Sequence, residues 1–149
     1  MNILDVAEKI ESKTASRYEK WQSVEKFCFD RFYDWAFNQS GVNAWFANCD
    51  GIAMLAYLCD VLCGWRTIEA ANYYKSELDT NVESYLAEVA VGHFKLGPYK
   101  QAVAKALRRI DALSRETDDS DVKLFVAEWK KLTKKYSNDI CKRLEQNRK

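Results

Sequence analysis

His93 is the only histidine of the chain, and it is the first residue to consider for chemistry. An imidazole titrates near neutral pH, so it serves as a general base or as a ligand of a metal or haem. His93 lies five residues before Pro98, the only proline, between two segments with helical patterns. In register with Val82, Leu86 and Val89, its side chain is expected to point inward at the end of a helix. The segment is therefore interpreted as a joint between two helices, with Pro98 in the first turn of the second helix.

Carboxylates and thiols are the other groups that could do chemistry. Asp30 and Asp34 are four residues apart and share a helix face, which is common for solvated carboxylates. The sequence contains no Gly-x-Ser-x-Gly motif, phosphate loop or dinucleotide fingerprint. Cys59 and Cys63 have helical spacing, but one histidine and no Cys-x-x-Cys pair do not make a zinc site. The sequence therefore predicts no enzyme activity, no metal and no cofactor.

Haem ligation is the specific alternative for His93. A helix ends near this histidine, and a short link with proline, a helix, a turn and a long final helix with an aromatic seam follow. This layout is similar to the C-terminal part of a globin. The resemblance implies that His93 holds the iron and that Phe46 wedges the haem. The chain departs from the globin pattern because it has no second histidine for the distal side, and no glutamine near Gly64.

Charge is unevenly divided along the chain, although the net charge is +1. Residues 1–94 carry 8 Lys+Arg and 14 Asp+Glu, whereas residues 95–149 carry 15 Lys+Arg and 8 Asp+Glu. The two halves are expected to attract each other within one fold, or the basic half is expected to face an anionic partner. The candidate binding residues are Lys105, Arg108, Arg109, Lys130, Lys131, Lys134 and Lys135.

Two features weaken a nucleic-acid interpretation of these basic residues. Glu128, Asp139 and Glu145 interrupt the lysine stripes of the last predicted helix. No motif of a known DNA- or RNA-binding module accompanies the stripes. Clustered cations still bind phosphates, so nucleic acid remains an alternative to an ordinary solvated face or an acidic protein surface.

Aromatic residues gather between positions 27 and 46. Each ring can bury about 150 Å² or more, so the simplest interpretation is a central core helix. The alternative is that some rings are exposed as a hot spot for a partner, or line a pocket for a flat ligand. The sequence leaves the core and the surface interpretations open. The aromatic residues of this segment are Phe27, Phe29, Phe32, Tyr33, Trp35, Phe37, Trp45 and Phe46.

Helices are the elements that position these residues, since five Gly and one Pro leave few breakers. We expect Asn2 to cap the first helix and Asp50 to cap the third. Thr80 and Glu83 form a capping box, which favours a break inside the segment 67–94. The pattern contains no convincing strand. Apolar spacing of three and four predicts helices over residues 3–10, 16–37, 50–63, 67–94, 98–113 and 122–144.

Length and composition predict one soluble domain over residues 1–149, since 48% of the residues are hydrophobic and 30% are charged. The expected fold is all-α, a compact bundle of about six helices (five to seven) without a β-sheet. The longest apolar run, residues 52–59, is too short to span a membrane, and the N-terminus does not resemble a signal peptide. Five irregularly spaced cysteines indicate reduced thiols in the cytoplasm.

Together these observations predict a non-enzymatic cytosolic protein that binds a macromolecular partner, as an adaptor, an inhibitor or a small accessory subunit of a larger complex. A protein partner is favoured. The alternative is a helical nucleic-acid-binding subunit that uses the basic C-terminal third, and the third hypothesis is a globin-like haem protein. The heptad-like seam of Phe125, Trp129, Leu132 and Tyr136 allows a homodimer, although a seam inside the domain explains it equally well.

Overall fold

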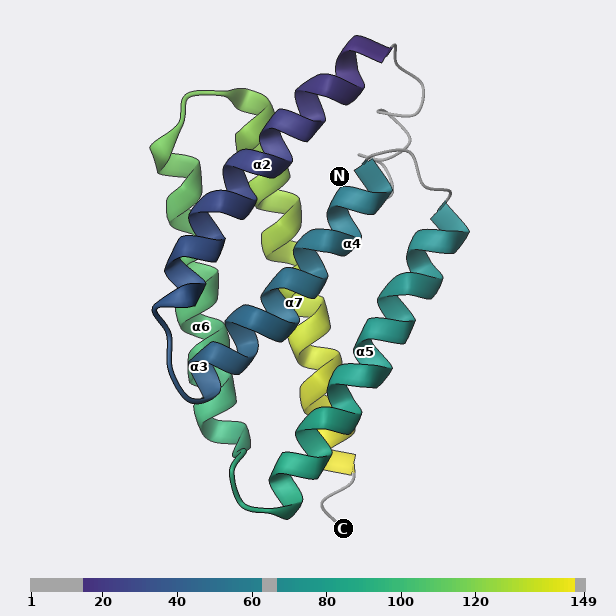
Figure 1. The fold of residues 1–149 in the computed structure, drawn as a ribbon, viewed down its shortest axis with the longest axis vertical. Coiled ribbons are helices and arrows are strands. Elements are labelled where there is room, and N and C mark those ends of the chain that lie inside the picture. The colour runs from purple at the N-terminus through teal and green to yellow at the C-terminus, as the bar shows by residue number, and fades with distance from the viewer. Residues whose placement is uncertain (1–14, 63–66, 147–149) are drawn as a thin grey trace.

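A computed structural model describes residues 15–62 and 67–146, and these residues form an all-α bundle without a strand (Figure 1). The predicted fold class is therefore confirmed. The helix expected over residues 3–10, with its Asn2 cap, lies outside the described residues, as does Cys63. The elements in chain order are α2 (Ala15–Phe37), α3 (Val42–Trp45), η1 (Phe46–Gly51), α4 (Ile52–Leu62), α5 (Thr67–Ala90), α6 (Leu96–Leu113), η2 (Ser114–Glu116) and α7 (Ser120–Gln146).

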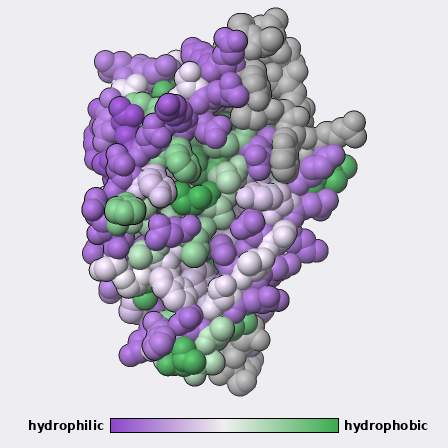
Figure 2. Space-filling model, viewed as in Figure 1, coloured by the Kyte–Doolittle hydropathy of each residue, from purple (hydrophilic) through white to green (hydrophobic). Residues whose placement is uncertain are grey.

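The helices are arranged in two layers, with α2, α4 and α5 in front of α6 and α7 in the view of Figure 1. Helix α4 lies between α2 and α5 and packs on α7 behind it. Figure 2 shows the front face, on which apolar side chains gather between α2 and α4 and polar side chains surround them. One hydrophobic core runs through both layers, from Trp21 on α2 to Leu144 on α7.

The inner face of α2 is the one that its apolar spacing predicts. Trp21, Val24, Cys28 and Phe32 are all buried. The Phe32 ring meets Trp129 of α7 edge-on, with ring centroids 4.8 Å apart. It also lies so close to Gly51 that a Cβ there would stand 2.7 Å from the Phe32 ring. Glycine at position 51 is thus what allows α2 and η1 to approach each other.

A continuous helical run from Val42 to Leu62 corrects the predicted start at Asp50. The run begins after Gly41, whose φ of 61° ends the preceding turn, and it includes a π-helical segment, η1. Asp50 lies inside that segment and is fully buried, so it does not cap a helix. By length and composition alone the run could cross a membrane. Because 67% of its most apolar window is buried in the bundle, it has the burial of a core helix.

Helix α5 is unbroken from Thr67 to Ala90, so the break predicted at Thr80 is wrong. The Thr80 hydroxyl donates to the Ser76 carbonyl at 3.0 Å, one turn earlier, instead of capping a new helix. The helix ends where Gly92 adopts a φ of 80°. Pro98 lies in the first turn of α6, as predicted.

The apolar seam of α7 is used inside the bundle. Phe125, Trp129, Leu132 and Tyr136 are all buried within one molecule. A homodimer through this seam would require the core to open, so the structure gives that hypothesis no support.

Candidate partner-binding surfaces

His93 does not point inward, which corrects the prediction. Its side chain is 73% exposed, and Nδ1 lies 3.1 Å from Glu88 Oε2. The chain turns sharply after α5, and it is the next residue, Phe94, that enters the core and stacks on Tyr85. Phe46 is fully buried against Tyr99, and neither His93 nor Phe46 lines any of the grooves described below. The geometry therefore does not support the haem hypothesis.

A buried polar cluster surrounds Asp50, and we call it the Asp50 cluster (Asp50, Asn81, Tyr85, Tyr99, Tyr136). Asp50 Oδ1 accepts hydrogen bonds from Tyr85 Oη at 2.8 Å and from Asn81 Nδ2 at 3.3 Å, and Oδ2 accepts one from Tyr99 Oη. The Asn81 amide also donates to Tyr136 Oη at 2.7 Å. One carboxyl group thereby joins η1 to α5 and α6 directly, and to α7 through Asn81.

Burial raises the pKa of Asp50 to about 7, although the hydrogen bonds from Tyr99, Tyr85 and Asn81 lower it. Burial, and then the nearby charge of Asp50, raises the pKa of Tyr85, Tyr99 and Tyr136 above its ordinary value. The three phenols consequently stay protonated at neutral pH. Asp50 is the member of the cluster that changes charge near neutral pH.

A groove of about 570 Å³ lies over this cluster, between η1 and α5. Trp45 and Cys49 line one side, and Asn81 and Tyr85 line the other. Burial, and then the charge of Asp50, raises the pKa of the Cys49 thiol, so this cysteine is a weak nucleophile. Asp50 itself is not accessible from the groove because its side chain has no exposed surface.

The predicted basic residues do not form one patch. Lys130, Lys131 and Lys134 line a hollow between α7 and α6. Lys135 lies instead over the ring of Tyr74 on α5, 5.5 Å from its centroid. Lys105 and Arg108 are exposed on α6 but line none of the grooves described here.

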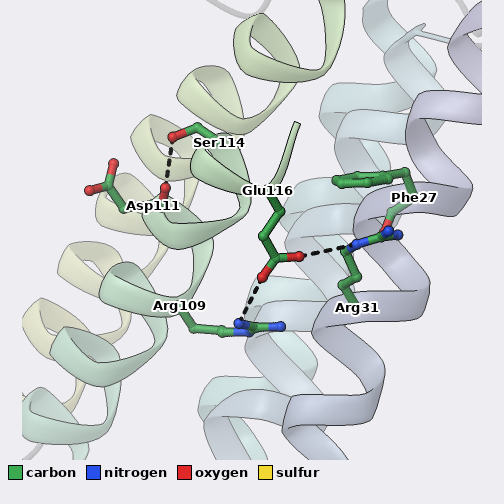
Figure 3. A network of polar contacts seen from close by, with 6 residues as sticks. All are labelled: Phe27, Arg31, Arg109, Asp111, Ser114 and Glu116. Carbon is green, nitrogen blue, oxygen red and sulfur yellow. Dashed lines mark hydrogen bonds and ion pairs between the residues drawn. The ribbon is translucent and has the colours of Figure 1, made fainter. Parts of the chain in front are cut away.

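Arg109 belongs to a polar joint between α2 and the end of α6 (Figure 3). Glu116 on η2 accepts from Arg109 Nη1 at 3.2 Å and from Arg31 Nε at 3.1 Å. The Arg31 guanidinium also lies over the Phe27 ring, 3.5 Å from its centroid. These side chains are partly exposed, so each pair contributes roughly 1 kcal/mol or less. Arg109 thus forms an ion pair within the molecule, and its part in partner binding stays a prediction.

Two separate hollows along α6 and α7 share Lys134 in their lining, and together we call them the basic groove. The first has a volume of about 500 Å³ and the second about 690 Å³. Its accessible apolar surface comes from Leu107, Ala104 and Ala127, and the buried Val126 and Val103 lie beneath. The charged side chains that line the groove are Lys100, Lys123, Lys130, Lys131, Lys134 and Lys142, with Asp111, Asp139 and Glu145.

Lys100 and Lys130 of the basic groove pair with Glu145 and Asp111, which are acids of the same half of the chain. Arg143 pairs with Asp79, which joins a cation of the second half to an acid of the first. The pairs Lys20–Asp121 and Arg31–Glu116 join a cation of the first half to an acid of the second half. Glu128, expected to interrupt the lysines at the surface, is instead buried beside Lys131. That the basic half faces an outside partner stays a prediction.

The outer face of α2 carries three exposed rings, which we call the aromatic stripe (Phe29, Tyr33, Phe37). Their exposed fractions are 38%, 46% and 76%. Phe29 stacks on Tyr33 with centroids 5.6 Å apart, and Tyr33 is 6.3 Å from Phe37. The aromatic cluster of residues 27–46 is therefore partly core and partly surface.

The sequence holds a signal for the aromatic stripe, which its interpretation left open, and for the burial of Asp50, which its interpretation missed. The stripe residues are spaced by four, each one position after an inward residue of α2 such as Cys28 or Phe32. Asp50 is the only charged residue between Asp34 and Asp60, in an otherwise uncharged stretch. A lone carboxylate in such a stretch requires buried partners.

Comparison of the chain with protein-family models, with curated proteins and with solved structures finds no match.

Proposed function

We propose that this protein is a non-enzymatic, cytosolic binding protein, and that the aromatic stripe on α2 contacts a protein partner. The observation that carries the proposal is the exposure of three neighbouring rings on one helix face. Aromatic residues supply much of the binding energy at protein interfaces, and they are enriched at interface cores. The roles named from the sequence, as an adaptor, an inhibitor or an accessory subunit, all require such a contact surface.

The arrangement of the stripe favours binding because its rings already lie together. Phe29 and Tyr33 are stacked before any partner arrives, so less side-chain entropy is lost on association. Burial of apolar area contributes about 25 cal/mol per Å², and each ring offers a large area. Three rings on one helix face suit a partner with an apolar pocket or groove.

The charges beside the stripe indicate what surrounds that pocket. Asp30 and Asp34 are exposed on the same helix and flank the rings, and the exposed Lys26 lies one turn before Phe29. Complementary charges steer association, so the partner surface is expected to carry Lys or Arg around an apolar centre. A second copy of this chain suits the stripe less well, because Asp30 and Asp34 of the two copies would repel each other.

Replacement of the stripe residues tests the proposal. We expect the variant Phe29→Ser, Tyr33→Ser, Phe37→Ser to keep its fold, because the three rings are exposed. It should lose most of the protein partners that the wild type captures from a lysate of the source cells, as measured by quantitative mass spectrometry. The matched control, Lys105→Ser with Arg108→Ser, changes two exposed side chains of α6 and should retain these partners. Equal recovery by all three proteins would contradict the proposal.

Nucleic-acid binding is the second candidate function, and the lysines of the basic groove are the observation in its favour. It predicts binding with a steep salt dependence that weakens when Lys130, Lys131, Lys134 and Lys135 are neutralised. The separation of Lys135 from the groove and the acids along the groove walls reduce its support.

A further inference from the structure

We propose that the basic groove is a second binding site, and that its ligand is an acidic amphipathic helix supplied by a partner protein. The groove lies between α6 and α7, whereas the stripe lies on α2, so this inference does not depend on the stripe. Three properties of the groove support it: its shape, its apolar surface and the spacing of its cations.

The two hollows follow one another along the same pair of helices. Helices α6 and α7 run antiparallel, since Lys130 lies 3.4 Å from Asp111 near one end and Lys100 lies 3.4 Å from Glu145 near the other. Along α7 the lining residues extend from Lys123 to Glu145, which is about 33 Å at 1.5 Å per residue. That length matches a ligand helix of about six turns.

Leu107, Ala104 and Ala127 form a small apolar strip in the groove, on which a helix can pack. Val126 and Val103 are buried there, and Leu107 is partly exposed. Ala104 and Ala127 are exposed on α6 and α7, and their small side chains let a third backbone approach. The distance between packed helix axes depends on the side chains at the contact. An amphipathic helix would bury its apolar face on this strip.

The lysines are spaced to meet acids on a neighbouring helix. Lys123, Lys130 and Lys134 follow each other at intervals of seven and four residues, and so lie on one side of α7. A ligand helix with Glu or Asp at the same intervals would present an acid to each. Among the residues that the structure describes, Lys123, Lys134 and Lys142 form no ion pair, so their charge is available to the ligand.

Nucleic acid fits the same groove less well. Single strands are bound mainly by stacking of bases on aromatic side chains, and no aromatic residue is among those lining the groove. Asp111, Asp139 and Glu145 lie on its walls and would repel phosphates. The apolar strip would also have no counterpart on a phosphate backbone.

A designed peptide probes the site directly. The probe is a fluorescent peptide of about six helical turns, with leucines along one face and glutamates on both flanks. A scrambled peptide of the same composition keeps the charge but loses the apolar face. A single-stranded and a double-stranded DNA oligonucleotide of similar length complete the set. Binding to the full-length protein is measured by fluorescence anisotropy at low salt.

We expect the amphipathic peptide to bind at least about tenfold more tightly than the scrambled peptide and both oligonucleotides. Lys130→Glu with Lys134→Glu should weaken peptide binding at least about tenfold, since like charges would then meet. Ala104→Trp, which fills the apolar strip without a change of charge, should do the same. The matched control, Lys105→Glu with Arg108→Glu, makes the same charge change on α6 outside the groove and should bind as the wild type does.

Circular dichroism and thermal unfolding establish that each variant is folded. The inference is overturned if the amphipathic peptide does not bind, or if the scrambled peptide or an oligonucleotide binds as tightly. It is also overturned if the Lys105 and Arg108 variant loses as much affinity as the groove variants, because the effect would then reflect net charge alone.

Discussion

The variant Asp50→Asn should gain stability relative to the wild type as the pH rises from about 4 to about 7. Native Asp50 has a pKa of about 7, whereas an unfolded aspartate titrates near 4. Between these values the native state holds a proton that the unfolded state has released. The free energy of unfolding contributed by Asp50 therefore falls by about 1.4 kcal/mol for each pH unit, on the order of 4 kcal/mol in total, and is constant above pH 7.

Urea unfolding at several pH values measures this effect. The relevant quantity is the difference between the free energies of unfolding of Asp50→Asn and the wild type, because other titrating groups cancel in it. Asp30→Asn, a change at an exposed carboxylate of α2, serves as the control. If this difference in the free energy of unfolding does not change between pH 4 and pH 8, the pKa of Asp50 is not raised in the native state.

Substitution of Phe32 should lower the stability of the protein much more than substitution of its neighbour Tyr33. Phe32→Ala is expected to lower the free energy of unfolding by about 3–5 kcal/mol, as for other buried aromatic residues. Its ring is fully buried and packs against Trp129 and Trp35, and it closes over Gly51. Tyr33→Ala, one residue later, removes a ring that is 46% exposed, and should change stability by less than about 1 kcal/mol.

Thermal or chemical unfolding of the two variants checks the contrast. If Phe32→Ala does not fold, Phe32→Leu, which fills more of the same space, provides the buried comparison. A loss at Tyr33 as large as the loss at position 32 would mean that the stripe is part of the core. The rings of the stripe would then not be exposed, and they could not contact a partner.

The fold was predictable because apolar residues recur at intervals of three and four in nearly every segment. The steps of three and four on α2 and α7 correctly gave buried faces, and Pro98 correctly marked the start of α6. The errors fall where local signals compete with packing. Asp50 and Thr80 are good capping residues, yet both lie inside continuous helices, since their partners come from tertiary contacts or from the preceding turn.

The candidate surfaces were harder to predict because each depends on how helices rotate in the bundle. Lys130, Lys134 and Lys135 are close in sequence, but a rotation of one hundred degrees per residue sends Lys135 toward Tyr74 of α5. His93 follows a helix end where Gly92 turns the chain, so the apolar register of α5 no longer applies to it. Two adjacent faces of α2 are both rich in aromatic rings, and the sequence alone does not show which of them is buried.

Photo-crosslinking from position 33 shows whether the aromatic stripe contacts a partner protein inside cells. Tyr33 is replaced by benzoylphenylalanine, which keeps an aromatic ring there, and the protein is irradiated in the source cells. We expect a cross-link to one partner protein from position 33, and none to that partner from position 105, which is exposed on α6. Cross-links that are absent from position 33, or equally strong from both positions, would contradict binding through the aromatic stripe.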